Sequence, residues 1–142
     1  MTTIYLYPSF CFFEGTDISI GRCTHVPFQL VGHPCIKKAD YYVTPISMPG
    51  AKSPTHRDKE CGGLYLAELG REFFYERQAI DLSALLNYYK QFEPKDEFFT
   101  NYFDKLAVNN ILRLQIIDGK REVEMRNSRT QGSERFIVVR KK

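Results

Sequence analysis

A short segment interrupted by glycines carries the clearest chemistry of the chain. Gly15 and Gly21 permit close backbone approach there, so neighbouring polar groups can converge. A guanidinium beside carboxylates suits an acidic, hydroxyl-rich ligand, because arginine can bind a carboxylate through two hydrogen bonds. The same side chains are also typical of an ion pair between Arg22 and Glu14 that only fastens a turn. The polar residues of the segment are Glu14, Thr16, Asp17, Ser19, Arg22 and Thr24.

Two cysteine–histidine pairs in the same region suggest metal binding as an alternative. One residue separates Cys23 from His25, and one residue separates His33 from Cys35. Residues i and i+2 of a strand share a face, so these four side chains could form a tetrahedral zinc site. The spacing matches no recognised zinc-finger pattern. We therefore expect no metal and no other cofactor.

Composition and charge exclude several classes of partner. The chain has 142 residues, of which 43% are hydrophobic and 26% charged, as in an ordinary globular protein with a single domain, residues 1–142. Its net charge of +3 comes without the dense basic stripe of a nucleic-acid-binding protein. No stretch approaches the ~20 apolar residues of a membrane span, and no secretory signal is recognisable. From these features alone we expect a cytoplasmic chain that binds neither nucleic acid nor membrane.

The first half of the chain is rich in β-branched and aromatic residues, which predict short strands. We expect strands at residues 4–7, 10–13, 28–31, 41–44 and 64–66. A polar loop covers residues 45–63, and loops of this length in a compact domain are usually either functional or disordered. It contains His56, which with Cys61 could imitate a thiol–imidazole dyad.

The second half changes to helical periodicity. Asp81 is suited to cap a helix whose apolar positions recur with the spacing of one helix face. A second helix is predicted over residues 102–117, with Gly119 as its C-terminal stop. Residues 121–139 are compatible with either a strand or a helix. We therefore predict an α+β fold, in which a mixed sheet from the N-terminal half packs against two or three C-terminal helices.

The segment 7–34 resembles the signature of a known family, the NamZ-type exo-β-N-acetylmuramidases, formerly a domain of unknown function. In that family a Tyr-Pro pair leads to a Phe-Glu-Gly-Thr-Asn turn, then to Ser-x-Gly-Arg-Gly-Thr, Pro-Phe and Gly-x-Pro. The similarity spans nearly the whole chain and is closest to the C-terminal domain of these proteins. The matching residues here are Tyr7-Pro8, Phe13-Glu14-Gly15-Thr16-Asp17, Ser19, Gly21-Arg22-Cys23-Thr24, Pro27-Phe28 and Gly32-His33-Pro34.

The resemblance implies a glycoside hydrolase of peptidoglycan turnover that removes N-acetylmuramic acid from non-reducing ends. In such proteins a larger Rossmann-like N-terminal domain precedes this one, and the sugar lies in the cleft between the two. The ligands would be muramic acid sugars, and the location would be periplasmic or secreted. The resemblance makes Glu14 the best catalytic candidate in this chain. It assigns sugar contacts to Glu14, Thr16, Asp17, Arg22, Thr24 and His33.

Three departures from the family pattern qualify this expectation. Cys23 replaces the usual Gly, Asp17 replaces the usual Asn, and residues 127–130 lack the usual Trp and Leu of the last helix. We expect that helix to pack poorly, and the isolated chain to be inactive. A non-catalytic module that binds sugar or protein is the alternative function. Its partner would be a separate N-terminal domain or a second copy, and the chain would be a truncated or split family member.

Overall fold

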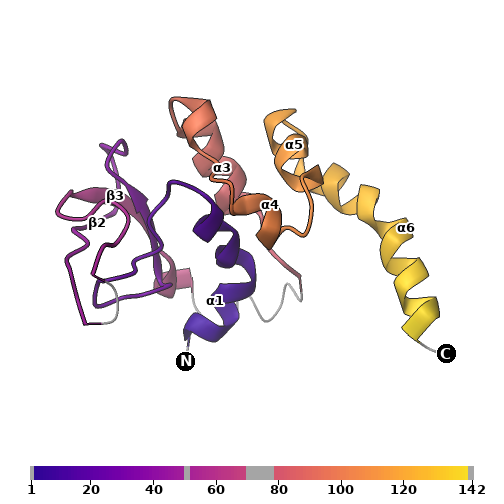
Figure 1. Ribbon diagram of the computed structural model, residues 1–142, viewed down its shortest axis with the longest axis horizontal. Coiled ribbons are helices and arrows are strands. Elements are labelled where there is room, and N and C mark those ends of the chain that lie inside the picture. Colours follow the sequence, from indigo (N-terminus) through magenta and orange to yellow (C-terminus); the bar gives the residue numbers. More distant parts are fainter. Residues whose placement is uncertain (1, 50–51, 70–78, 141–142) are drawn as a thin grey trace.

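The computed structural model describes residues 2–49, 52–69 and 79–140. It confirms an α+β fold, with a small sheet at one end and helices over the rest of the molecule (Figure 1). No helix in these ranges has the length and apolar character needed to cross a membrane. In chain order the elements are α1 (Thr2–Phe10), η1 (Cys11–Gly15), β1 (Leu30–His33), β2 (Tyr41–Val43), β3 (Cys61–Tyr65), η2 (Leu66–Leu69), α3 (Ser83–Gln91), η3 (Lys95–Glu97), α4 (Phe103–Leu106), α5 (Ile111–Ile117) and α6 (Glu122–Arg140), where η denotes a 3₁₀ helix.

The sheet has three strands in the order β1–β3–β2. Both pairings are antiparallel, with Leu30 opposite Tyr65 and Tyr41 opposite Gly63. The described sheet is therefore antiparallel rather than mixed. Its strands lie where the last three expected strands were placed, with shifted bounds. The long polar segment between β2 and β3 forms no further strand in its described part.

The two strands expected before residue 14 are wrong, because the chain is helical there. Residues 4–7 lie in α1, and residues 10–13 pass from the end of α1 into η1. Leu6 and Phe10 are four residues apart and both buried, whereas Ile4 and Tyr7 are exposed. Burial of one helix face thus outweighs the β propensity of the isolated segment. Pro8 lies inside α1, where it lacks the N–H needed for one helical hydrogen bond.

The helical half follows the expectation more closely. The Asp81 side chain accepts a hydrogen bond from the Ser83 N–H at 2.8 Å, one residue before the N-cap of α3, which is Leu82 and makes no side-chain cap. The expected helix at 102–117 is divided into α4 and α5, because Val108 adopts a left-handed φ of 71° and Asn109 Oδ1 accepts the Ile111 N–H. Gly119 ends α5 with a φ of 70°, as predicted.

Of residues 121–139, all except Arg121 are helical and belong to α6, which projects away from the rest of the molecule (Figure 1). Met125, near its start, is buried and anchors it, whereas Phe136 is 65% exposed. The poor packing expected of the last helix therefore describes its C-terminal half.

The core connects the helical layer to η1. Phe13, Phe98 and Phe103 are fully buried, and their neighbours form one apolar cluster with residues of α1, β1 and α3. Gly15, at the end of η1, lies directly against the backbone of Phe103: a Cβ atom at this position would stand 2.5 Å from the Phe103 Cα. The turn that follows is fixed by a hydrogen bond from the Asp17 N–H to the Phe98 carbonyl. The core therefore holds the polar segment in place.

Candidate functional site

Glu14 and Arg22 form the centre of the site. Arg22 Nη2 donates to Glu14 Oε2 at 2.9 Å, and the Arg22 side chain remains 55% exposed. The guanidinium lies 5.2 Å from the centroid of the Phe28 ring, and Tyr7 packs edge-on against the same ring. The Tyr7 hydroxyl donates to Glu14 Oε1 at 3.3 Å, and the negative charge of Glu14 raises the pKa of Tyr7. Two rings and one carboxylate thus hold the arginine, which still faces solvent.

Beside this pair the surface is hollowed by about 270 Å³. One wall comes from the segment between η1 and Cys23, and the opposite wall comes from residues 53–55 of the long loop. Its lining is mixed polar and apolar, as in many sites for small polar ligands. The lining residues are Phe13, Glu14, Thr16, Ile18, Ser19, Ile20, Arg22, Cys23, Ser53, Pro54 and Thr55.

The hydroxyls of the segment stabilise its turns. Thr16 Oγ1 donates to the Phe13 carbonyl and accepts the Ile18 N–H, so it is committed to the backbone. Thr24 Oγ1 donates to the Gly21 carbonyl at 2.6 Å and lies outside the lining of the hollow. Cys23, where the family usually has Gly, adopts a left-handed φ of 61°. The turn after Arg22 is therefore retained although its residue carries a side chain.

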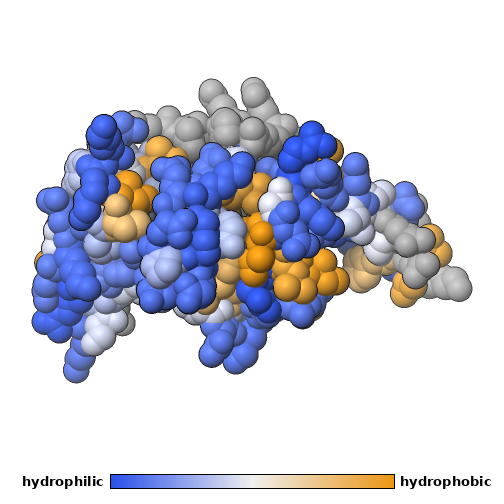
Figure 2. Space-filling view, turned by 90° about the horizontal axis from the view of Figure 1, so that it is seen from above, coloured by the Kyte–Doolittle hydropathy of each residue, from blue (hydrophilic) through white to orange (hydrophobic). Residues whose placement is uncertain are grey.

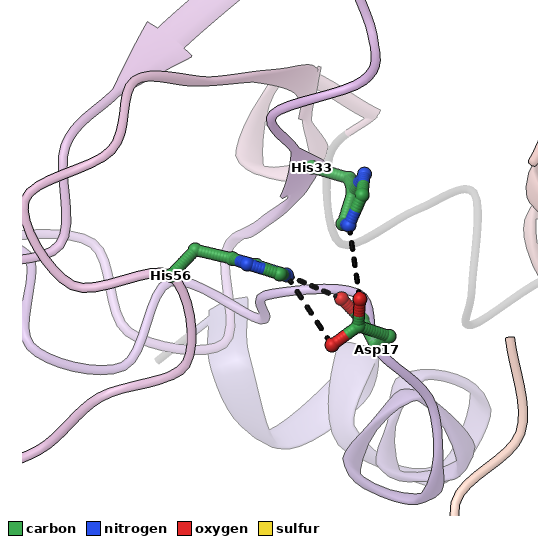
Figure 3. A group of neighbouring side chains, drawn as sticks. All are labelled: Asp17, His33 and His56. Carbon is green, nitrogen blue, oxygen red and sulfur yellow. Dashed lines mark hydrogen bonds and ion pairs between the residues drawn. The ribbon is translucent and has the colours of Figure 1, made fainter. Parts of the chain in front are cut away.

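The Asp17 side chain lies outside the lining of the hollow and meets two histidines (Figure 3). His33 Nε2 lies 3.1 Å from Asp17 Oδ2, and His56 Nε2 lies 2.6 Å from the Asp17 carbonyl oxygen. The two imidazole rings pack edge-on with centroids 4.4 Å apart, and both side chains are nearly buried. His33 was expected at the site. His56 was not, because nothing in the sequence indicates that the long loop returns to residue 17.

The four residues of the zinc alternative do not come together as a group of ligands in the described chain. Among the described residues, the one group of three or more possible ligands is Asp17, His33 and His56, which excludes Cys23, His25 and Cys35. The proposed dyad of His56 with Cys61 lacks an activated thiol, because burial raises the pKa of Cys61 to about 11. The Cys61 thiol instead donates to the Lys59 carbonyl.

Comparison with known proteins decides the family. The family model described as exo-β-N-acetylmuramidase NamZ, C-terminal, matches residues 5–142. The chain belongs to this NamZ C-terminal family. It is 33% identical over 150 aligned positions to the peptidoglycan β-N-acetylmuramidase NamZ of Bacillus subtilis, which covers 97% of the chain. It is also similar to the crystal structure of a DUF1343 family protein from Bacteroides fragilis, with a TM-score of 0.90 and 40% identity over 99% of the chain.

Both relatives are much longer than this NamZ C-terminal domain. The chain covers 36% of the Bacillus subtilis protein and 40% of the Bacteroides fragilis chain. Residues 7–34, which carry the resemblance, lie within the matched range. They contain Glu14, Arg22 and the turn between them.

Proposed function

We propose that this domain is part of a peptidoglycan β-N-acetylmuramidase and forms one wall of the cleft that receives the sugar. Its family membership and the name of its Bacillus subtilis relative support the activity. The single observation that supports the location is the Glu14–Arg22 pair at the edge of the hollow, where the guanidinium is held but half exposed.

In this proposal Arg22 recognises the carboxylate of the sugar. N-acetylmuramic acid carries a lactyl carboxylate that N-acetylglucosamine lacks, and a planar guanidinium can bind such a group with two parallel hydrogen bonds. Glu14 and the Phe28 ring would fix the plane of the guanidinium in advance, which lowers the entropic cost of binding.

Cleavage requires more than this wall. Most glycosidases use two carboxyl groups on either side of the scissile bond, and among the described residues Glu14 is the one carboxylate in the lining of the hollow. We therefore place the remaining catalytic carboxylate on the part of the protein that the longer relatives have in addition. The isolated domain would then bind sugar without hydrolysing it.

Arg22→Lys tests the proposal. Lysine keeps the charge but not the planar fork, so the affinity for N-acetylmuramic acid should fall about tenfold or more. Affinity for N-acetylglucosamine should stay nearly unchanged. Both sugars are titrated by NMR or calorimetry, with the chain alone and with a homologous N-terminal domain added.

Arg57→Lys is the matched control, because Arg57 is 51% exposed and pairs with Asp58 outside the lining of the hollow. It should leave both affinities unchanged. Equal weakening of both sugars by Arg22→Lys, or no weakening of either, would show that Arg22 is only structural.

A second candidate function is a protein-interaction module without catalysis. The exposed apolar residues of α6 favour it, because such surface in a soluble protein usually marks an interface. The partner would be a separate chain with the N-terminal domain, or a second copy of this chain.

A further inference from the structure

Asp17, His33 and His56, here called the histidine clasp, connect the two segments that form the walls of the hollow. Asp17 directly follows Thr16 of one wall, and His56 directly follows Thr55 of the other. His33 ends β1, and its ring packs at 4.8 Å against that of Phe92, which is buried. Three segments distant in the sequence therefore meet at one point (Figure 3).

The hydrogen-bond partners fix the proton positions on both rings. The Cys35 N–H donates to Nδ1 of His33 at 3.1 Å, so the proton of the neutral ring lies on Nε2, which donates to Asp17 Oδ2. Nε2 of His56 faces a carbonyl oxygen, which only accepts, so it also carries a proton.

These tautomers decide between two interpretations of the clasp. Two imidazoles and a carboxylate have the composition of a metal site. A metal ion, however, needs a lone pair on each ligating nitrogen, and both nitrogens that face the centre are donors. Metal binding would place the His33 proton on Nδ1, directly opposite the Cys35 N–H. The hydrogen bonds therefore favour a clasp held by N–H donors of both histidines, without a metal ion; we call this the proton-closed clasp.

The His56 backbone gives an independent indication that the loop is held in place. His56 adopts a left-handed φ of 57°, which non-glycine residues rarely adopt unless their surroundings impose it. The loop is fastened further by the Asp58 N–H, which donates to the carbonyl of buried Pro45.

We infer that the histidine clasp positions residues 53–55, which form one wall of the hollow, against residues 14–22, which form the other. The clasp would thereby set the width of the sugar-binding hollow. His56 is the positioning residue, acting through its hydrogen bond to the Asp17 carbonyl. This inference rests on the proposed function, because the hollow is taken to be the sugar site. The clasp itself is a feature of the loop and can be tested without sugar.

The first measurement is amide hydrogen exchange by NMR on the whole chain. His56→Ala removes the donor and should accelerate exchange at least about tenfold at Arg57 and Asp58, whose N–H groups bond to the Pro54 and Pro45 carbonyls. His56→Gln keeps an N–H donor and should restore most of the protection. His25→Ala is the control, since His25 is exposed and lies outside the clasp. Unchanged exchange in His56→Ala would overturn the inference.

The second measurement is the affinity for N-acetylmuramic acid at unchanged global stability. His56→Ala should weaken it severalfold and His56→Gln should restore it, a rescue that a purely structural loss would not give. If exchange responds as expected while the unaltered chain binds no sugar, the proposed function fails and the clasp stands. If sugar binds and His56→Ala leaves its affinity unchanged, the role in the hollow is refuted.

Zinc chloride added to the metal-free chain distinguishes the two interpretations of the clasp. The ring signals of His33 and His56 should not shift. Saturation of both at one equivalent of zinc would overturn the proton-closed clasp in favour of a metal centre.

Discussion

At the scale of single residues, Arg22 combines restraint with exposure. Its Nη2 donates a hydrogen bond to Glu14, and the guanidinium carbon lies over the Phe28 ring. An exposed ion pair alone contributes at most about 1 kcal/mol to stability. The arrangement therefore gains little for the fold, whereas it fixes the orientation of a group that can bind an anion. Tyr7, which donates to the other Glu14 oxygen, extends this restraint to α1.

Cys23 is strained, and replacing it should relieve the strain. A non-glycine residue in the left-handed region costs about 1–2 kcal/mol, and Cys23 has such a φ. Replacement by Gly removes this cost, but Gly also loses more conformational freedom on folding, which offsets part of the gain. We expect Cys23→Gly to raise the free energy of unfolding by about 0.5–1 kcal/mol, measured from denaturant midpoints. Cys35→Gly is the control, since Cys35 is not among the left-handed residues, and it should destabilise. A loss of stability in Cys23→Gly would mean that the thiol contributes more than the strain costs.

His33 should make stability depend on pH. Burial lowers its pKa and so do His56 and Lys59, while the hydrogen bond to Asp17 opposes them. Since the folded pKa is below the ordinary value of about 6.5, the unfolded chain binds more protons between these two values. The free energy of unfolding should therefore keep its full value above about pH 6.5 and should decrease as the pH falls from there towards the pKa of His33 in the folded chain.

Thermal unfolding followed across this pH range checks the expectation. His33→Gln should remove this part of the pH dependence, while His25→Ala should leave it in place. A wild-type profile that stays flat from pH 7 to pH 5 would contradict the lowered pKa.

At the scale of elements, Gly15 connects η1 to α4. A Cβ atom there would stand 2.5 Å from the Phe103 Cα and 2.8 Å from its N, and neither backbone atom can move freely. We expect Gly15→Ala to lower the free energy of unfolding by about 2 kcal/mol, within the range of overpacked cores. Gly132→Ala is the matched control: Gly132 lies in α6 with nothing within 4 Å, so helix propensity should make the change neutral or stabilising. Equal effects of the two variants would show that η1 and α4 separate easily.

The elements that the sequence predicts correctly are those with a strong local pattern. The helix after Asp81 has regular apolar spacing and a carboxylate that accepts the first N–H of the helix, and Gly119 ends α5, so both helices can be predicted without tertiary information. Helix α1 has no such pattern, because Ser9 takes one of its inward positions and Pro8 interrupts it.

The candidate site divides in the same way. The Glu14–Arg22 pair lies within one segment and could be predicted from the sequence. The sequence also allowed the alternative interpretation, an ion pair that only stabilises a turn. His56 is 39 residues from Asp17, and only the fold of the long loop brings them together. A contact of this sequence separation leaves no periodic pattern in the chain.

At the scale of the whole molecule, apolar surface remains uncovered at the end formed by α6. Figure 2 shows apolar patches there. Four consecutive residues, 136–139, are each at least half exposed. Successive helical positions are 100° apart, so four in a row point almost all the way round the axis. The C-terminal half of α6 therefore leaves much of its apolar surface uncovered in the described chain, although Ile137 also lines a hollow with Phe12 and Leu82.

This surface should make the isolated chain associate with itself. Burying the exposed part of four such side chains would contribute about 1 kcal/mol each, enough for reversible association at raised concentration. We expect the weight-average sedimentation coefficient to rise with concentration. Phe136→Lys combined with Val139→Lys places two charges on one face and should abolish the rise, while Val108→Lys, at an apolar residue 88% exposed outside α6, should leave it unchanged.

Adding a homologous N-terminal domain should compete with self-association if both cover α6. A wild-type chain that sediments as a monomer at every concentration, with or without that domain, would show that α6 is simply solvated and would remove the support for the interaction module.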